Sequence, residues 1–226
     1  AGSNYSRQVN TLIGTKGVGL TSGYLYPGAT YPYGMVQFTP SYFSKRSGFV
    51  INQLSGGGCE HMGNFPTFPV KGKLKMSPDN ILNYRINISE EKGHAGYYEA
   101  MVQEDIKAKL TVTERTGMAS YEYPADQQYG TVIIGGGISA TPIEQAAIVI
   151  TAPNKCEGYA EGGNFCGLRT PYKVYFVAEF DTDALESGTW KRNELKPNTT
   201  FAEGEYSGVY FTFDVNKKKN IQYKIG

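Results

Sequence analysis

The chain lacks any strong imbalance of charge and any long hydrophobic run. Its 226 residues include 22 Lys and Arg against 21 Asp and Glu, a net charge of +1. No broad electrostatic field therefore points to nucleic acid or to an anionic membrane as a partner. No apolar stretch approaches the roughly twenty residues that a membrane-spanning helix needs. We expect a neutral ligand or a protein partner, and no membrane span.

Sustained helical periodicity and internal repeats are also missing. No segment has apolar residues at helical spacing over three turns, and the best candidate, residues 143–150, equally fits a buried strand. Glycine and proline are spread along the chain rather than gathered into a linker. Because a chain of this length can bury one substantial core, we predict a single domain over residues 1–226.

Most of the sequence alternates apolar and polar residues with a period of two, which is typical of strands with one buried face. The clearest runs are residues 107–113, 172–180 and 209–215. A polar, lysine-rich interruption at 216–220 is followed by a further short run at 221–225, which predicts a hairpin. Together with 18 Tyr and 11 Phe, which favour strands, this pattern predicts an all-β fold.

The three cysteines make an odd count. Cys156 and Cys166 bracket the glycine-rich segment 157–165. A disulfide that closes this segment as a loop is plausible if the protein is exported, because exported chains meet oxidising conditions. We favour this bridge, and two unrelated reduced thiols are the alternative.

Potential catalytic and metal-binding side chains do not form a recognisable pattern. Cys59, Glu60 and His61 are consecutive, and neighbours on an extended chain point in different directions, whereas zinc ligands are usually separated by two or more residues. Nothing in the sequence pairs any two carboxylates across a cleft. We predict no metal site and no catalytic residue in this chain; the carboxylates considered are Glu60, Glu91, Glu99, Glu104 and Asp105.

Two loop-like motifs are more informative than these single residues. Residues 26–37 read YPGATYPYGMVQ, and residues 54–65 read LSGGGCEHMGNF. Residues 9–15, 68–72, 96–98 and 106–117 add further pieces in the same order, the last of them a basic, Thr-rich strand that ends in Arg-x-Gly. In these segments the chain resembles the N-terminal domain of glycoside hydrolase family 92, the calcium-dependent exo-α-mannosidases.

The resemblance implies a large antiparallel two-sheet β-sandwich that packs on a helical (α/α)6-barrel domain expected after residue 226. It also implies an inverting exo-α-mannosidase of mannose-containing glycans. In the family both catalytic carboxylates and most calcium ligands come from the barrel domain, so this chain alone is expected to be inactive. An exported location rests on the same resemblance. A stand-alone carbohydrate-binding module and a purely structural sandwich are the alternatives.

The sugar site of the family lies between the two domains, and this chain would form one wall of it. Tyrosines, glycine amides and short polar side chains on irregular loops can close such a pocket against water. The expected contributors are Tyr24, Leu25, Tyr26, Gly57, Gly58, Cys59, Glu60 and His61. The sequence departs from the family's pattern at Ile51 and Gln53, where histidines are common, and at Asn64, where Asp is common. These departures put the linkage specificity in doubt.

Overall fold

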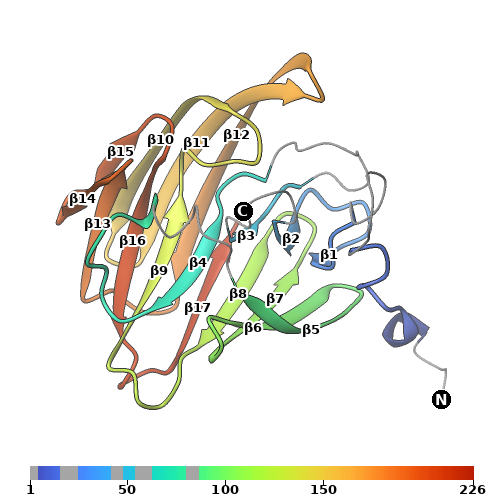
Figure 1. The fold of residues 1–226 in the computed structure, drawn as a ribbon, viewed down its shortest axis with the longest axis horizontal. Helices are drawn as coiled ribbons and strands as arrows, with labels where there is room; N and C mark the ends of the chain where they lie inside the picture. Colours follow the sequence, from blue (N-terminus) through green and yellow to red (C-terminus); the bar gives the residue numbers. More distant parts are fainter. Residues whose placement is uncertain (1–4, 16–24, 42–47, 54–62, 80–86) are drawn as a thin grey trace.

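The computed structural model describes residues 5–15, 25–41, 48–53, 63–79 and 87–226, which form two antiparallel β-sheets (Figure 1). Sheet 1 has eight strands in the order β1 (Ala29–Thr30), β2 (Gln37–Pro40), β3 (Phe49–Val50), β4 (Thr67–Lys71), β9 (Tyr129–Gly135), β16 (Ser207–Asp214), β13 (Glu186–Lys191) and β14 (Glu194–Pro197).

Sheet 2 has nine strands. Their order is β15 (Phe201–Glu203), β10 (Ile143–Ala152), β11 (Lys155–Phe165), β12 (Leu168–Phe180), β17 (Asn220–Ile225), β8 (Gly117–Glu122), β7 (Ile106–Val112), β6 (Tyr97–Val102) and β5 (Ile88–His94). One 3-10 turn, η1 (Tyr5–Gln8), precedes the strands. The predicted all-β fold is confirmed. In the described ranges no helix combines the length and the apolar character that crossing a bilayer would require.

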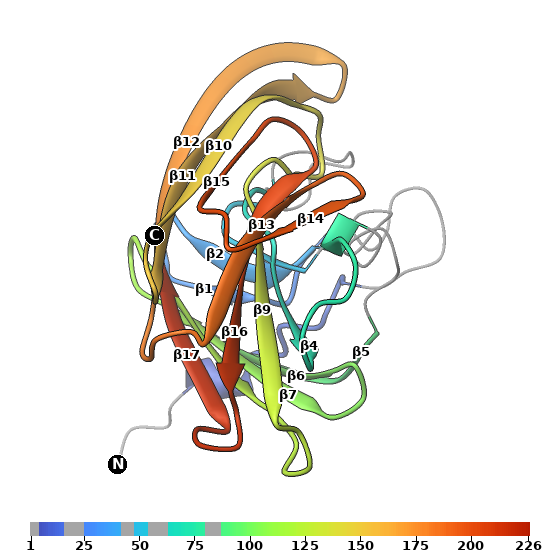
Figure 2. The same cartoon turned by 90° about the vertical axis from the view of Figure 1, so that its left-hand side faces the viewer.

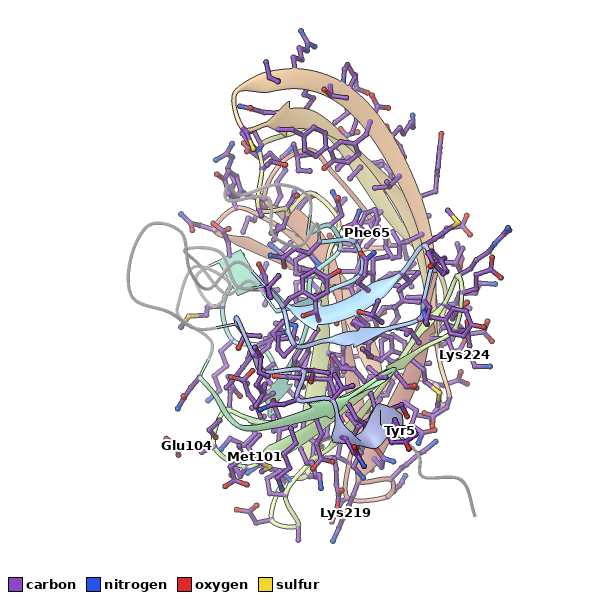
Figure 3. All side chains as sticks on the ribbon, turned by 90° about the vertical axis from the view of Figure 1, so that its right-hand side faces the viewer. Tyr5, Phe65, Met101, Glu104, Lys219 and Lys224 are labelled. Carbon is purple, nitrogen blue, oxygen red and sulfur yellow. The ribbon has the colours of Figure 1, made fainter. Side chains whose placement is uncertain are left out.

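The two sheets pack face to face over an aromatic core (Figure 2). Phe180 of β12 lies with its ring centroid 4.9 Å from that of Phe211 and 5.1 Å from that of Phe213, both on β16 of the opposite sheet. At the curved end of sheet 2, Phe65 contacts Phe176 at 4.2 Å between centroids (Figure 3). These contacts follow from the period-two pattern, in which every second residue of each strand points to the opposite sheet. The β-sandwich is confirmed.

Three buried hydroxyl groups also join the sheets. Thr67 of β4 accepts a hydrogen bond from the Tyr223 hydroxyl at 2.5 Å and lies 3.2 Å from the Tyr121 hydroxyl. The two phenol oxygens are 2.9 Å apart, and Thr67 can donate to the Phe49 carbonyl at 3.3 Å. Because the hydroxyls satisfy one another, polar atoms are tolerated at the centre of an otherwise apolar interior.

The centre of sheet 1 is buried on both faces. Tyr210 and Thr212 of β16 were expected on the solvent side of the alternation, yet they are 4% and 0% exposed. The chain that follows β4 crosses this outer face. Lys73 forms an ion pair with Glu186 of β13 at 2.8 Å, and the Ser77 hydroxyl donates to the carbonyl of Arg192. Residues 72–79 therefore act as a strap over the sheet.

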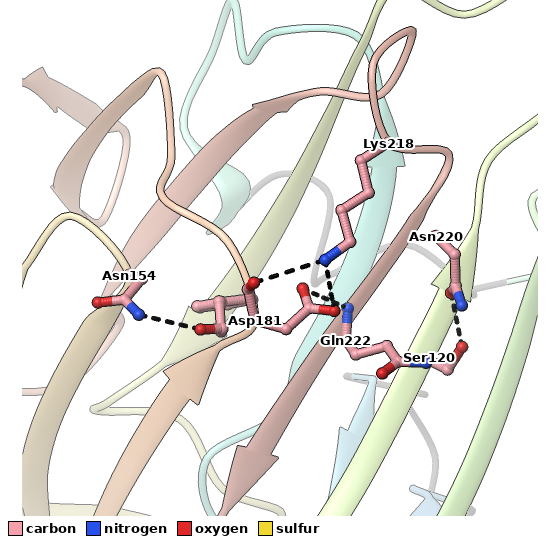
Figure 4. Close-up of polar contacts among 7 residues, drawn as sticks. Ser120, Asn154, Asp181, Lys218, Asn220 and Gln222 are labelled. Atoms are coloured by element: carbon pink, nitrogen blue, oxygen red, sulfur yellow. Dashed lines mark hydrogen bonds and ion pairs between the residues drawn. The ribbon is translucent and has the colours of Figure 1, made fainter.

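The hairpin predicted for residues 209–225 is wrong. Strand β16 pairs with β9 and β13 in sheet 1, whereas β17 pairs with β12 and β8 in sheet 2. The Asp181 carboxylate at the end of β12 accepts hydrogen bonds from the Gln222 amide at 3.2 Å and from Lys218 at 2.7 Å (Figure 4). Alternation specifies which residues face inward, and a chain that crosses the core satisfies it as well as a hairpin does.

The favoured disulfide between Cys156 and Cys166 is also wrong. Cys156 is a free and fully buried thiol, whereas Cys166 is disulfide-bonded. The segment between them is not a loop but strand β11, which pairs with β12 along its length. At about 3.3 Å per residue, its two ends lie roughly 30 Å apart, far beyond the reach of a disulfide.

Candidate functional site

The motif at residues 26–37 forms an ordered path into β1 and β2. The Gly28 amide donates to the Thr39 hydroxyl at 3.2 Å. A Cβ atom at Gly28 would lie 2.1 Å from the Thr39 Cβ and 2.4 Å from the Phe38 carbonyl oxygen. Only glycine permits this approach, so the segment is pressed against β2 and its position is fixed by packing.

The residues just after this contact present apolar side chains to solvent. Tyr31, Tyr33 and Met35 are 50%, 105% and 70% exposed. The Gly34 amide donates to the Tyr31 carbonyl at 2.9 Å, and the Met35 amide donates to the Glu114 carbonyl at 2.7 Å. A hydrogen-bonded turn thus holds two aromatic rings outward, which suits contact with another surface.

Of the predicted wall residues, the structure places Leu25 and Tyr26. Leu25 is 43% exposed, and its amide donates to the Gly14 carbonyl at 3.3 Å. Tyr26 is partly buried; burial raises the pKa of its phenol, and a hydrogen bond with Thr30 lowers it in part. The two residues are adjacent at the entry to β1. The other six, Tyr24, Gly57, Gly58, Cys59, Glu60 and His61, lie outside the described residues.

A buried polar cluster lies where the second motif leaves the described structure. Asn64 is fully buried, and its side-chain oxygen accepts hydrogen bonds from the Asn52 amide at 2.9 Å and from the Tyr172 hydroxyl at 3.2 Å. The Asn64 backbone amide donates to the Asn52 side-chain oxygen at 2.7 Å. The side-chain nitrogen of Asn64 has no acceptor, and the buried side-chain oxygens of Gln53 and Thr141 also lack partners.

Each buried polar atom without a hydrogen-bond partner lowers the stability of the fold by about 1–3 kcal/mol. Asn64 and Gln53 flank residues 54–62 in sequence, and the Cβ position of Gly162 on β11 lies 3.0 Å from both the Pro142 carbonyl and the Tyr172 hydroxyl. The end of sheet 2 therefore meets the base of the second motif. Three polar groups with unused hydrogen-bonding capacity at this place are consistent with a binding surface.

Four of the carboxylates considered in the sequence lie on or between β5, β6 and β7: Glu91, Glu99, Glu104 and Asp105. The hydrogen bond from Tyr97 and the charges of nearby lysines lower the pKa of Glu99, which makes it a poor proton donor at neutral pH. Glu99 accepts from Tyr97 at 2.6 Å, Glu91 accepts from Tyr98 at 3.0 Å, and Asp105 pairs with Lys71 at 2.9 Å. Glu104 lies in the turn between β6 and β7.

Among the described residues no three His, Cys, Asp or Glu side chains come close enough to hold a metal ion.

The described residues form a β-sandwich in which residues 26–37 lead into β1 and β2 and Tyr172 of β12 contacts Asn64. The family model "Glycosyl hydrolase family 92 N-terminal domain" matches residues 8–226. The chain belongs to this family. It is a family 92 N-terminal domain over nearly its whole length.

Several solved structures with similar folds are described as family 92 enzymes. The family GH92 α-mannosidase BT3965 from Bacteroides thetaiotaomicron superimposes with a TM-score of 0.83 at 23% identity, over 99% of this chain and 33% of that protein. The glycosyl hydrolase ccman5 of the same family gives 0.79 at 20% identity, over 98% and 32%. The inverting mannosidase BT2199 from B. thetaiotaomicron gives 0.78 at 23% identity, over 96% and 30%.

A curated relative adds a sequence match. An uncharacterized secreted glycosidase of Arthroderma benhamiae is 31% identical over 138 residues, which cover 52% of this chain and 17% of that protein. The family 92 domain described here thus spans about a third of the length of the similar solved structures and less of this relative.

Sequence reasoning missed the role of Tyr172 and treated Asn64 only as a departure from the family's pattern. Tyr172 was expected on the inward face of its strand, and it does point to Asn64, a residue 108 positions earlier in the chain. No local signal encodes that contact. The position of Asn64 directly after the glycine-rich sequence 54–63 is the feature that could have drawn attention to this residue.

Proposed function

We propose that this chain is the N-terminal domain of an exo-α-mannosidase that hydrolyses α-mannosidic linkages of mannose-containing glycans with inversion. The match of the family model over residues 8–226 is the main support. The similar solved structures described as mannosidases, of which the chain covers about a third, support the same proposal. A helical (α/α)6 domain after residue 226 is the proposed partner in the same polypeptide.

The division of labour between the domains is part of the proposal. Inversion needs a carboxylic acid that protonates the leaving oxygen and a carboxylate that activates water, roughly 6.5–9.5 Å apart on opposite sides of the sugar. Glu91 and Glu99 instead accept hydrogen bonds from tyrosines of β6, and Asp105 pairs with Lys71 of β4. As the resemblance to the family implies, both catalytic groups and most ligands of a calcium ion are assigned to the other domain.

The task of this chain is to close the pocket. Leu25 and Tyr26, held at the entry to β1 by the Gly28 contact, offer an apolar side chain and a phenol to a terminal sugar. The remaining proposed contributors are Tyr24, Gly57, Gly58, Cys59, Glu60 and His61. A rigid wall of this kind excludes water and fixes the orientation of the sugar, both of which lower the barrier to hydrolysis.

Export of the protein is proposed as well. Cys166 is disulfide-bonded, which fits an oxidising compartment. The A. benhamiae relative is described as secreted.

The proposal is tested by comparing this chain with the longer polypeptide that includes the expected helical domain. Both are incubated with α-linked mannobiose in calcium or in a chelator, and released mannose is measured. The longer protein should release mannose in calcium only, and the chain alone should release none in either condition. Turnover by the chain alone would contradict the division of labour, and an inactive longer protein would contradict the function.

The wall is tested by Tyr26→Ala in the longer protein. Loss of a positioning contact should lower kcat/KM by about tenfold or more, because a single transition-state contact is typically worth over 1 kcal/mol. Tyr206→Ala is the control, since Tyr206 is also partly exposed but lies in the turn before β16. Equal activity of the two variants would exclude Tyr26 from the wall.

A further inference from the structure

The outer face of sheet 2 has a shallow hollow that the proposed function does not use. It has a volume of about 370 Å³. The strands that line it, β15, β10, β11 and β12, lie side by side in sheet 2 (Figure 1). The side chains that face it are those opposite the core positions of these strands: Ala147, Val149, Glu157, Tyr159, Tyr175, Val177 and Phe201.

The strand register explains why a hollow forms here. Ala147 of β10 lies opposite Tyr159 of β11, which lies opposite Tyr175 of β12. In the next row of the sheet Val149 lies opposite Phe201 of β15. Cross-strand neighbours on one face are about 5 Å apart. Two small residues on β10 therefore leave a floor between Phe201 on one side and the tyrosines on the other.

The rings at this floor are unusually open to solvent. Tyr175 is 69% exposed and Phe201 is 54% exposed. The centroids of Tyr159 and Tyr175 are 6.0 Å apart with the rings tilted by 47°. Rings at this exposure contribute little to the core, and nothing in the described parts of the chain covers them.

A charged pair borders the aromatic rings. The Lys173 ammonium lies 4.1 Å from the centroid of Tyr159 and 5.5 Å from that of Tyr175. It is held by an ion pair with Glu161 at 2.5 Å. Because this cation is already neutralised and Glu157 adds a negative charge to the floor, the hollow does not suit an anion. It does offer hydrogen-bond donors and acceptors at its edge.

A ligand for this surface needs a flat apolar face and a polar perimeter without charge. The pyranose ring has these properties, because its C–H groups can lie on an aromatic ring while its hydroxyls reach Lys173, Glu161 and the tyrosine hydroxyls. The volume lies within the range of small-molecule sites. The continuous ladder of β10, β11 and β12 holds the rings in place before binding, which lowers the entropic cost of association.

We propose that this hollow is a binding site for a neutral glycan, separate from the loops at residues 25–35 and from the pocket between the domains. Such a site would hold a polysaccharide to the protein while terminal sugars are removed elsewhere. The choice of α-mannan as the glycan rests on the proposed function, whereas the choice of a neutral pyranose rests on the hollow itself.

The test is native gel electrophoresis of this chain in gels that contain α-mannan, dextran or polygalacturonate. The chain should be retarded by α-mannan, and Tyr175→Ala and Phe201→Ala should each weaken the retardation about tenfold, the loss expected when one ring contact worth about 1.4 kcal/mol is removed. Tyr175→Phe keeps the ring and should bind as the parent does. Tyr5→Ala is the matched control, because Tyr5 is 72% exposed and lies on η1.

The outcomes separate the two proposals. Retardation by dextran that depends on Tyr175 supports the neutral-glycan site and removes only the assignment to mannan. Retardation by polygalacturonate alone, no retardation by any polymer, or equal retardation of Tyr175→Ala and the parent overturns the site. None of these results affects mannose release by the longer protein, which tests the proposed function independently.

Discussion

Alkaline pH should unfold this domain through its buried tyrosines. Tyr121, Tyr123 and Tyr223 are each no more than 2% exposed. Burial raises the pKa of all three phenols well above the ordinary value near 10, because the phenolate would lose its hydration inside the core. In the unfolded chain the same groups ionise near pH 10.

The sign and the size of the pH dependence of the free energy of unfolding follow from proton linkage. A raised pKa in the folded state means that the native protein keeps protons that the unfolded chain releases, so this stabilisation is complete below pH 10 and is lost as the pH rises above it. Each such tyrosine lowers the free energy of unfolding by about 1.4 kcal/mol per pH unit in that window. Three give roughly 4 kcal/mol per unit, which offsets an ordinary stability of about 5–15 kcal/mol within about one to four units.

The assay is denaturant unfolding followed by circular dichroism at a series of pH values from about 8 to about 11, with tyrosinate absorbance as a second signal. Tyr121→Phe removes one of these groups and should reduce the slope above pH 10 by about 1.4 kcal/mol per pH unit. Tyr33→Phe removes a phenol that is fully exposed, and the slope should match the parent. If Tyr121→Phe keeps the parent's slope, burial of this phenol is not the source of the pH dependence.

Three further variants or treatments address packing and the cysteines. A Cβ atom at position 208 would lie 2.2 Å from the Trp190 ring, so Gly208→Ala should lower the free energy of unfolding by about 1–3 kcal/mol in denaturant titrations; an unchanged midpoint would show that the ring moves freely. Tyr172→Phe removes the hydrogen bond to Asn64 and should lower the free energy of unfolding by about 1 kcal/mol in the same assay. Because the two residues share this bond, adding Tyr172→Phe to an Asn64→Ala variant should lower it no further. Burial raises the pKa of the Cys156 thiol, so a thiol-alkylating reagent should label Cys156 only after denaturation without reductant, and labelling of the native protein would contradict the buried position.

Strands and their inward faces could be predicted because the signal is local. Residues 107–112 alternate in sequence, and Ala108 and Leu110 are indeed buried on β7. The identity of a strand's neighbour is not local. The run at 209–215 belongs to one sheet and the run at 221–225 to the other, although only a short turn separates them. Both arrangements bury the same side chains, so the pattern does not distinguish them.

Glycine misled the interpretation of residues 157–165. Their glycine content predicts a loop, since glycine-rich segments commonly form turns. In β11, however, a Cβ at Gly158 would lie 2.4 Å from the Ala147 carbonyl oxygen, and one at Gly163 would lie 2.6 Å from the Thr170 carbonyl oxygen. These glycines allow neighbouring backbones to approach closely within a sheet. The predicted disulfide between Cys156 and Cys166 is wrong because the segment between them is a strand and not a loop.

The candidate site was accessible to sequence reasoning only in part. The prolines and glycines of the motif at residues 26–37 predict an ordered, tyrosine-rich loop. Gly28 is tightly packed, as that composition suggests. The cluster of Asn52, Asn64 and Tyr172 joins three distant parts of the chain. The hollow on sheet 2 forms because small residues of β10 lie beside aromatic residues of the neighbouring strands. The register between these strands determines those neighbours.

The strap formed by residues 72–79 limits how a second domain can meet this one. On the outer face of β16, in the middle of sheet 1, Tyr210 and Thr212 are already buried. We therefore expect a neighbouring domain to approach along the rim, where the residues around 25–35 emerge, which leaves the hollow on the outside of sheet 2 open. An orientation that stacks a helical layer flat on sheet 1 would first require the strap to be displaced.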